Sequence, residues 1–234
     1  MVNLLRKGKE RILSNKIQMI NADCMDYMKT CKDNEFDLAI VDPPYGIDAG
    51  NGFTGEIRRS GKGVAKKSAF AKKDWDKNAP DEEYFNELKR VSKNQIIWGA
   101  NYYPQYLSSS MGWIVWDKDN GTTKFSDCEL AFSSFDLALR KFTFTWNGML
   151  QGDMKNKEHR IHPTQKPAKL YQWLLDKYAK PTDRILDTHL GSASSAIAAH
   201  YFGCEFVGIE LDEDYFKASQ ERFNLATKQN DFGF

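Results

Sequence analysis

Short apolar runs alternate with longer amphipathic stretches along the chain, and most of the apolar runs end at a polar residue. The run from Phe36 to Val41 is the clearest, because it has the length of a buried parallel strand and stops at Asp42. Similar runs predict strands at residues 17–20, 95–98, 114–116, 184–187 and 206–209. A helical spacing of apolar residues predicts helices at 26–32, 81–92, 167–180, 192–202 and 213–227. The segments 129–135 and 139–146 predict an antiparallel hairpin.

This order of elements predicts an α/β fold with a mostly parallel sheet, one antiparallel hairpin and helices on both faces. Acidic residues stand at the predicted carboxyl ends of strands, namely Asp23, Asp42, Asp187 and Glu210. Because the carboxyl ends of parallel strands meet at one edge of a sheet, these acids are expected to share a crevice. Ligands of open α/β sheets bind in such a crevice, where the strand order reverses.

The composition is that of a cytoplasmic enzyme with one domain, residues 1–234. A chain of 234 residues with 13% aromatics can build a full core. The net charge of +1 means that any surface for nucleic acid must be local. The four cysteines form no CxxC pair, which indicates reduced thiols, and His159 and His162 lack the companions of a metal site. Neither a signal peptide nor a run of about 18 apolar residues is present, so no membrane association is expected.

The segment Asp42-Pro43-Pro44-Tyr45 carries the most informative chemistry. Each proline fixes its own φ and restricts the residue before it, so the carboxylate and the ring are presented in one geometry. Neither proline has an N–H, which leaves the carbonyls of the turn available to a ligand. These oxygens suit the N–H donors of a planar amine, and the ring suits its π face. A proline-stiffened turn capped by a tyrosine would have the same sequence.

Residues 184–210 predict a strand–helix–strand unit with an acid at each strand tip, Asp187 and Glu210. In nucleotide-binding α/β folds the second acid accepts hydrogen bonds from the ribose hydroxyls. A dinucleotide fits poorly, because Gly191 is the only glycine in the loop and a pyrophosphate needs close backbone approach at several. An adenosine that carries an amino acid fits better, with Asp187 facing the ammonium. A plain strand–helix–strand unit is the alternative interpretation.

Together with His162-Pro163-Thr164-Gln165-Lys166-Pro167, these segments resemble the S-adenosylmethionine-dependent DNA amino-methyltransferases. The tetrapeptide precedes the cofactor loop, as in the permuted β group of that family, and the resemblance spans roughly residues 17 to 225. The family loop usually reads Asp-Pro-Phe-x-Gly-Ser-Gly, whereas this chain has Thr188, His189 and Ala193 at the second, third and seventh places. The resemblance implies a Rossmann-like methyltransferase fold, S-adenosylmethionine as cofactor, and double-stranded DNA whose target base is flipped out.

The resemblance also implies roles for individual residues. The catalytic turn is Asp42, Pro43, Pro44 and Tyr45, in which Asp42 and the Pro43 carbonyl accept the target amine and Tyr45 stacks on the base. Lys166 is expected to pair with the carboxylate of the cofactor. The expected cofactor contacts are Asp23, Cys24, Thr164, Gln165, Lys166, Asp187, His189, Gly191, Ser192 and Glu210. Asn101 and residues 116–118 either line the base pocket or serve as core and turn residues.

Two segments are predicted to contact nucleic acid. Residues 46–74 form a long, mobile basic loop that we interpret as a phosphate clamp, although a solvated charge run would look the same. Its basic residues are Arg58, Arg59, Lys62, Lys66, Lys67, Lys72 and Lys73. Residues 147–160 lie where the family places target recognition, and their candidates for base contacts are Gln151, Asn156, Lys157 and Arg160. So short a loop predicts a target of about two to four base pairs.

Aspartate at the head of the tetrapeptide favours adenine N6 in DNA, by resemblance. The alternatives are cytosine N4 in DNA, adenine N6 in RNA, a glutamine side chain, and a catalytically silent nucleic-acid-binding subunit. The permuted order argues against glutamine, and the intact tetrapeptide argues against a silent subunit. The sequence leaves open the recognition site, a cognate restriction enzyme and the formation of a homodimer.

Overall fold

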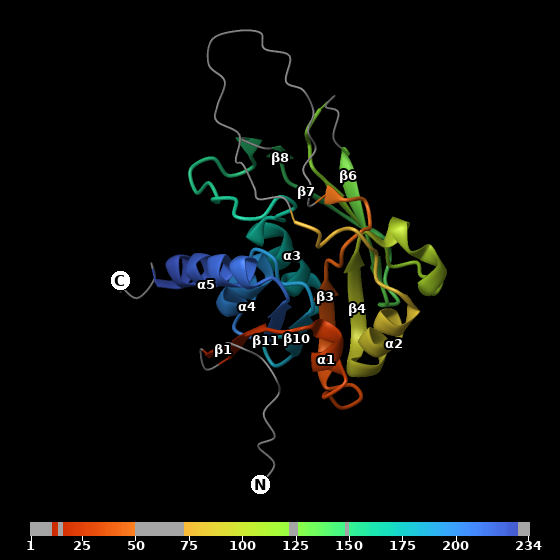
Figure 1. The fold of residues 1–234 in the computed structure, drawn as a ribbon. Helices are drawn as coiled ribbons and strands as arrows, with labels where there is room; N and C mark the ends of the chain where they lie inside the picture. The colour runs from red at the N-terminus through yellow and green to blue at the C-terminus, as the bar shows by residue number, and fades with distance from the viewer. Residues whose placement is uncertain (1–10, 14–15, 50–72, 122–125, 148–149, 229–234) are drawn as a thin grey trace.

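A nine-stranded sheet forms the centre of the computed structural model, which describes residues 11–13, 16–49, 73–121, 126–147 and 150–228 (Figure 1). The strands lie side by side in the order β1-β2-β11-β10-β3-β4-β6-β5-β7. Their bounds are β1 Arg11–Leu13, β2 Ile17–Asn21, β3 Phe36–Val41, β4 Ser92–Trp98, β5 Ile114–Asp117, β6 Cys128–Ser133, β7 Arg140–Thr143, β10 Arg184–Asp187 and β11 Glu205–Glu210. A separate ribbon pairs β8 (Trp146–Asn147) with β9 (Leu150–Gln151).

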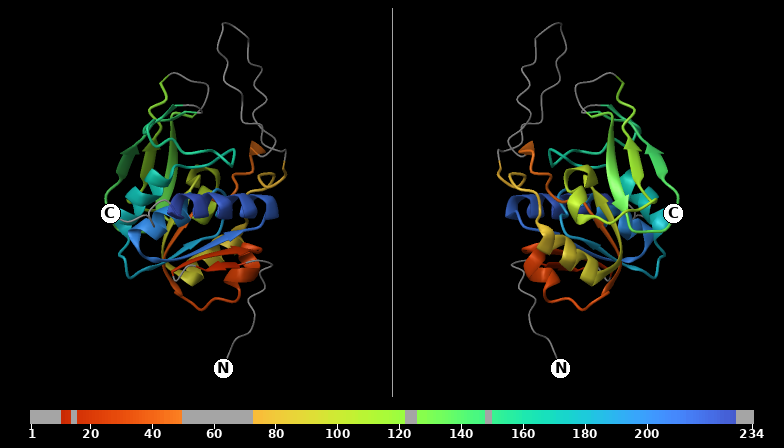
Figure 2. Two further views of the ribbon diagram at one scale, coloured as in Figure 1. Left: turned by 90° about the vertical axis from the view of Figure 1, so that its left-hand side faces the viewer. Right: turned by 90° about the vertical axis from the view of Figure 1, so that its right-hand side faces the viewer.

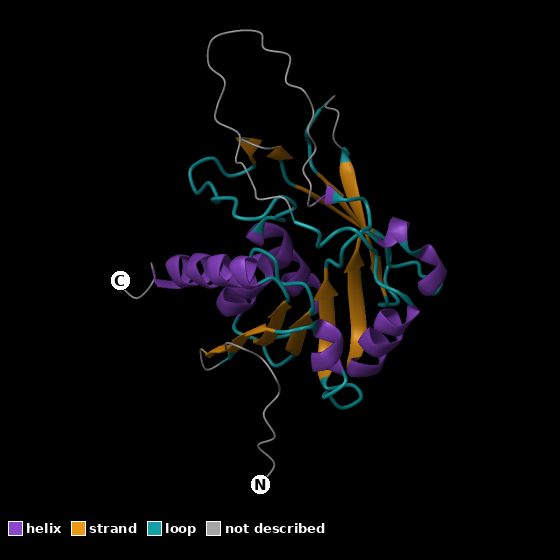
Figure 3. Ribbon diagram, viewed as in Figure 1, coloured by secondary structure: helices purple, strands orange, loops and turns teal. Residues whose placement is uncertain are grey.

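Helices cover both faces of the sheet, as the sequence predicted (Figure 3). Their bounds are α1 Cys24–Met28, α2 Glu82–Val91, α3 Ala168–Tyr178, α4 Ser194–Phe202 and α5 Glu213–Lys228, with short 3-10 turns η2 Ala100–Tyr102 and η3 Pro104–Tyr106. Along β3, Leu38 and Ile40 pack with α3, α4 and α5, while Ala39 and Val41 pack with α1 and α2. A strand buried on both faces reads as a continuous apolar run, which explains why the Phe36 run was so clear.

The five strands β2, β11, β10, β3 and β4 are adjacent and parallel, so their carboxyl ends meet at one edge. The chain order reverses between β10 and β3, which is where ligands of open α/β sheets bind. Reading along this edge, the strand tips bring Asp23, Glu210, Asp187 and Asp42 into one row. The strand order therefore confirms that these acids lie at one edge of the sheet.

The predicted hairpin of residues 129–135 and 139–146 is wrong. The strands β6 and β7 are separated by β5, which pairs antiparallel with β6 and parallel with β7. Alternation of side chains fixes which face a strand buries, but it does not specify the neighbouring strand. In Figure 2 these green strands extend above the blue helix α5. At the opposite edge of the sheet, Arg11–Leu13 adds β1 antiparallel to β2.

Two further features of the described residues bear on the predictions. No helix among them is both long and apolar enough to cross a bilayer. The four cysteines are free thiols: Cys31 and Cys204 are buried, Cys24 is half-buried and Cys128 is exposed.

Candidate active site

The tetrapeptide lies at the tip of β3, where Asp42 and Tyr45 face each other. The Tyr45 hydroxyl donates a hydrogen bond to Asp42 Oδ1 at 2.6 Å, and the Lys166 ammonium donates to Asp42 Oδ2 at 2.5 Å. Burial raises the pKa of Asp42, while Lys166 and Tyr45 oppose that rise. The side chain of Asp42 is 15% exposed, so the carboxylate is recessed but reachable.

Asp76 fixes the chain as it leaves the tetrapeptide. Its buried carboxylate accepts backbone N–H groups from Tyr45 at 2.5 Å, Gly46 at 3.1 Å and Ala49 at 2.8 Å. Three amide donors satisfy a carboxylate that would otherwise be costly to bury. Sequence reasoning missed Asp76, because an acid that follows a basic stretch gives no local sign of a backbone partner 27 to 31 residues away.

The ring of Tyr45 is half-buried. Tyr102 stacks on it with ring centroids 4.8 Å apart and an angle of 14° between the planes. Gly99 also approaches it closely: its φ is +68°, and an added Cβ would lie 2.1 Å from the Tyr45 ring. Tyr102 therefore covers part of the Tyr45 ring, and the stacking of Tyr45 on a base stays a prediction. Tyr102 is 41% exposed and offers the accessible aromatic surface at this tip.

Lys166 lies among carboxylates on the target side of the crevice. Its ammonium contacts Asp42, the Tyr45 hydroxyl at 3.1 Å and Glu129 Oε2 at 2.9 Å. Glu129 in turn pairs with Lys118 at 2.6 Å. The lysine is 3% exposed and already held by two carboxylates, which argues against the predicted pairing with a cofactor carboxylate.

The loop after β10 surrounds Asp187, which is 1% exposed. Its carboxylate accepts the Ser195 hydroxyl at 2.5 Å and the His189 N–H at 3.0 Å. Burial raises the pKa of Asp187 to about 7 despite these two donors. His189 lies edge-on to Tyr84, and burial lowers the pKa of its ring to about 4, so the imidazole is neutral at pH 7.

Glu210, at the tip of β11, closes the same loop. Its carboxylate accepts the Gly191 N–H at 2.8 Å and the Asp212 N–H at 2.9 Å. Burial raises the pKa of Glu210 to about 7. Ser192 is buried beside Ser194, with the two hydroxyl oxygens 3.1 Å apart. Each Glu210 oxygen keeps a lone pair for a further donor.

Asp23 and Cys24 stand beside Glu210 in the row of strand tips. Asp23 is the N-cap of α1, and its Oδ1 accepts the N–H groups of Met25 and Asp26 at 2.7 and 3.1 Å. Burial, with Asp23 nearby, raises the pKa of the Cys24 thiol to about 12. Asp23 therefore serves the helix in any case, and its second oxygen has no part in the cap.

The His-Pro-Thr-Gln-Lys-Pro segment is held by its own side chains. Gln165 is 3% exposed, accepts the Ile161 N–H at 3.0 Å and donates to the His159 carbonyl at 3.2 Å. Both ends of this amide bond within the protein and hold the loop, and the cofactor contact of Gln165 stays a prediction. Thr164 remains exposed, with its hydroxyl 3.1 Å from His162 Nδ1.

Comparison of the sequence with known proteins shows similarity to DNA methylases. A family model described as a DNA methylase of the N6/N4 type matches residues 136–221, which include the His-Pro-Thr-Gln-Lys-Pro segment and the loop after β10. The Type II methyltransferase M2.DpnII of Streptococcus pneumoniae is 25% identical over 92% of each chain. These matches support the interpretation that the chain is an N6/N4 DNA methyltransferase. The resemblance inferred from the motifs is thereby confirmed.

Solved structures confirm the methyltransferase fold of this DNA methylase. The M1.HpyAVI-SAM complex superposes with a TM-score of 0.54 at 20% identity, over 89% of this chain and 99% of the other. The PvuII DNA methyltransferase (cytosine-N4-specific) gives a TM-score of 0.59 at 11% identity, over 93% and 90% of the two chains. At these identities the likeness establishes the fold. The Asp42 turn lies outside the span of the family match, so its role depends on its own geometry.

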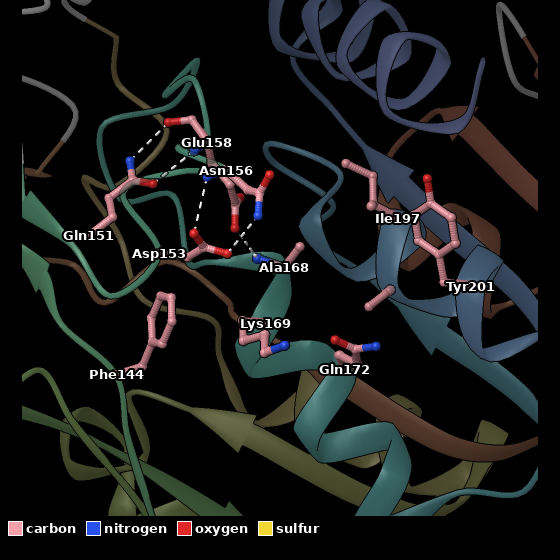
Figure 4. Close-up of a pocket in the computed structure, with 11 residues that line it drawn as sticks. Phe144, Gln151, Asp153, Asn156, Glu158, Ala168, Lys169, Gln172, Ile197 and Tyr201 are labelled. Carbon is pink, nitrogen blue, oxygen red and sulfur yellow. Dashed lines mark hydrogen bonds between the residues drawn. The ribbon is translucent and has the colours of Figure 1, made fainter. Parts of the chain in front are cut away.

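The predicted recognition loop of the DNA methylase is partly an internal brace (Figure 4). Gln151 is 6% exposed, and its amide bonds both the N–H and the carbonyl of Glu158, at 2.8 and 2.9 Å. The Arg160 guanidinium donates to the Pro163 carbonyl at 2.5 Å. Gln151 and Arg160 thus bond to backbone groups of the protein, and their contacts with DNA stay predictions. Asn156 and Lys157 are exposed and remain candidates for DNA contacts.

A cavity of about 190 Å³ lies between this loop and the helices α3 and α4 (Figure 4). Its walls include Phe144, Gln151, Gln172 and Tyr201. None of the residues assigned to the target amine or to the cofactor lines it. It is therefore separate from the crevice at the strand tips.

The basic loop of the DNA methylase lies mostly outside the described residues, which exclude Arg58, Arg59, Lys62, Lys66, Lys67 and Lys72. Lys73 is described, and its ammonium pairs with Asp212 at 2.5 Å and with Asp214 at 2.8 Å. Lys73 is thus paired with acids at the start of α5, and its contact with a phosphate stays a prediction. Within the described ranges, no group of three or more His, Cys, Asp or Glu side chains is placed to hold a metal ion.

We expect Asp187 to make the ligand-free enzyme less stable as the pH rises from about 4 to 7. In that window the folded chain keeps a proton on Asp187, whose pKa is raised to about 7, while the unfolded chain has released it. Raising the pH therefore lowers the free energy of unfolding. His189 acts in the opposite direction, because its lowered pKa leaves the unfolded chain with more protons below about pH 6.5.

The effect of Asp187 is measured as the difference in free energy of unfolding between wild type and Asp187→Asn. The variant keeps the shape of the side chain but cannot titrate. In urea unfolding, the free energy of unfolding of wild type relative to that of the variant should be smaller at pH 8 than at pH 5. An equal difference at the two pH values would contradict the titration of Asp187 in this range.

Proposed function

We propose that this DNA methylase transfers a methyl group from S-adenosylmethionine to N6 of adenine in double-stranded DNA. The observation that carries the proposal is the juxtaposition at the point where the strand order reverses. Asp42, at the tip of β3, has the acceptor chemistry for an amine, and the adjacent tips of β10 and β11 carry Asp187 and Glu210. A methyl donor on one side and an amine on the other would meet at this edge.

The residues of the cofactor side fit S-adenosylmethionine. Asp187 and Glu210 are carboxyls whose pKa values burial raises, so a bound cation or hydroxyl donor would stabilise their ionised forms. Asp187 would take the ammonium, and Glu210 would accept the ribose hydroxyls. We assign Asp23 and Cys24 to the adenine, and Thr164 to the methionine end. When bound, the cofactor supplies the methyl group.

The chain's own residues activate the amine by orientation. The lone pair of the exocyclic nitrogen is delocalised into the adenine ring, which makes it a poor nucleophile. Hydrogen bonds from its N–H groups to Asp42 and to the Pro43 carbonyl favour a pyramidal nitrogen and direct the lone pair to the methyl carbon. The Asp42 carboxylate also stabilises the positive charge that develops on nitrogen. The base must leave the duplex to reach this tip, where Tyr102 offers a stacking surface.

Purified protein, duplex DNA and S-adenosylmethionine labelled in the methyl group test the proposal. Digestion of the product and mass spectrometry of the nucleosides should detect labelled N6-methyldeoxyadenosine. A label mainly on cytosine would assign the enzyme to N4 chemistry instead. Equal or faster labelling of single-stranded RNA of the same sequence would favour the RNA alternative.

Removing positive charge from the basic loop should weaken DNA binding uniformly across sequences. Lys66, Lys67 and Lys72 are changed together to alanine, and the expected result is a flatter salt dependence. The slope of log affinity against log salt should fall by about 0.9 for each phosphate that the loop no longer neutralises. Lys73→Ala is the matched control, because Lys73 already pairs with Asp212. An unchanged slope in the triple variant would mean that the loop is a solvated charge run and does not contact phosphates.

The target site is expected to be short, about two to four base pairs around the methylated adenine for the chain acting alone. Of the four side chains first considered in the recognition loop, Gln151 and Arg160 bond to the protein itself. The exposed Asn156 and Lys157 can supply only a few base contacts. Mapping of methylated positions on a treated plasmid measures the site. Modification confined to six or more defined base pairs would refute this prediction.

A further inference from the structure

Four charged side chains of alternating sign connect the sheet to the catalytic turn. Lys118, after β5, pairs with Glu129 Oε1 at 2.6 Å, and Glu129 Oε2 lies 2.9 Å from the Lys166 ammonium. Lys166 then contacts Asp42 Oδ2 at 2.5 Å. The row is electrically balanced, with two ammonium groups and two carboxylates. Neither the family match nor the motifs assign a role to Glu129.

Burial makes this arrangement consequential for Asp42. Lys166 is 3% exposed, and a buried ammonium is costly unless carboxylates surround it. Two carboxylates hold its pKa above the usual lysine value against the effect of burial. The ammonium in turn lowers the pKa of Asp42, which burial would otherwise raise further. The lysine thereby favours the ionised form that can accept an amine.

Glu129 determines how Lys166 is shared. With Asp42 as its only acid, the ammonium would close onto that carboxylate and compete with the target amine. Glu129 gives the ammonium a second carboxylate partner. Lys166 and Lys118 lower the pKa of Glu129 to about 2 against the effect of burial. Each Asp42 oxygen then has one protein donor, Tyr45 or Lys166, and keeps a lone pair for the substrate.

We infer that Lys166 and Glu129 are positioning residues for the target amine: Lys166 keeps Asp42 ionised, and Glu129 keeps Lys166 from occupying Asp42 alone. This inference rests on the proposed function, because it assigns Asp42 to the amine. The other ionisable groups that interact electrostatically with Asp42 are Tyr45, Tyr84, Tyr103, Tyr171 and Asp187, and Lys118 pairs with Glu129.

The test is the pH dependence of single-turnover methyl transfer to a duplex oligonucleotide at saturating S-adenosylmethionine. Asp42 must be ionised, so activity falls on the acid side of its pKa. Lys166→Met removes the nearby cation and should move this acid limb upward by about 1–3 pH units. Lys166→Arg keeps the charge and should leave the limb near its wild-type position. A lysine with a purely structural role would lower the rate without moving the limb.

Glu129→Gln should lower the rate about tenfold, the size expected for one hydrogen bond to a charged group, without moving the acid limb upward. Glu129→Asp should recover part of the rate, because it restores a charge to share the ammonium. Lys141→Met is the control, since Lys141 forms an exposed pair with Asp117 on the neighbouring strands. It should change neither the rate nor the limb.

Affinity for S-adenosylmethionine, measured by calorimetry, is expected to stay within a few fold of wild type in every variant and reports folding. If Lys166→Met fails to fold, the Glu129 pair decides the inference alone. An acid limb at the wild-type position in folded Lys166→Met overturns the inference, and so does wild-type turnover in Glu129→Gln. A wild-type protein that methylates no adenine would instead refute the proposed function.

Discussion

Replacing Asp42 by alanine is expected to reduce methyl transfer to less than about one part in a hundred, because orientation and electrostatic stabilisation of the amine both depend on this carboxylate. The affinity for S-adenosylmethionine should stay within a few fold, since the cofactor is assigned to the neighbouring tips of β10 and β11. Single-turnover transfer and calorimetric titration measure the two effects separately.

Asp42→Asn provides the matched variant. It keeps the size of the side chain and one acceptor oxygen, but it leaves the buried Lys166 ammonium without one of its two carboxylates. We expect it to lose nearly as much activity as Asp42→Ala, because the charge and not the shape stabilises the developing positive nitrogen. A variant of Asp42 that retains most of the wild-type turnover would rule out the assigned role.

Replacing Glu210 by alanine should have the opposite effect to Asp42→Ala, because it should mainly weaken the binding of S-adenosylmethionine. Loss of charge-assisted bonds to the ribose is expected to cost about 1–3 kcal/mol of binding free energy. Glu210 also accepts the N–H groups of Gly191 and Asp212, so the loop that surrounds the cofactor would loosen as well. Calorimetry at pH 8, above the raised pKa of about 7, measures the effect with the carboxylate ionised.

Glu205→Ala is the control for this experiment. Glu205 begins the same strand, β11, at the end remote from the crevice, and it is exposed. Its removal should leave cofactor affinity unchanged. Equal affinities of wild type and Glu210→Ala would mean that the strand tips have been assigned to the wrong ligand.

Some parts of this site follow from short stretches of sequence. The Phe36 run ends at Asp42 and the Arg184 strand ends at Asp187, and local periodicity is sufficient to place both acids at strand tips. Ala193 illustrates the same point: it stands where the family loop has glycine, and it adopts a left-handed φ of +60°. Glycine is favoured where the backbone needs a left-handed φ, so alanine at this position of the loop is a departure that the sequence alone reveals.

Other parts depend on which distant segments the fold brings together. Lys166 meets Asp42 across 124 residues of chain, and Asp76 meets Tyr45 across 31. Glu129 stands two residues before Ala131 and therefore shares its face of β6, which is buried at Ala131. An acid is unusual at such a position. Its presence there indicates a buried partner but not which one.

The sequence by itself therefore determined the parallel core, the row of acids at its carboxyl edge and the resemblance to the amino-methyltransferases. Only the tertiary structure decided that Lys166 serves Asp42, that Gln151 and Gln165 hold loops, and that β5 separates β6 from β7. The physical reason is that periodicity and strand tips are properties of neighbouring residues. The partner of a buried polar group is instead set by strand order and register, which join residues far apart in the chain.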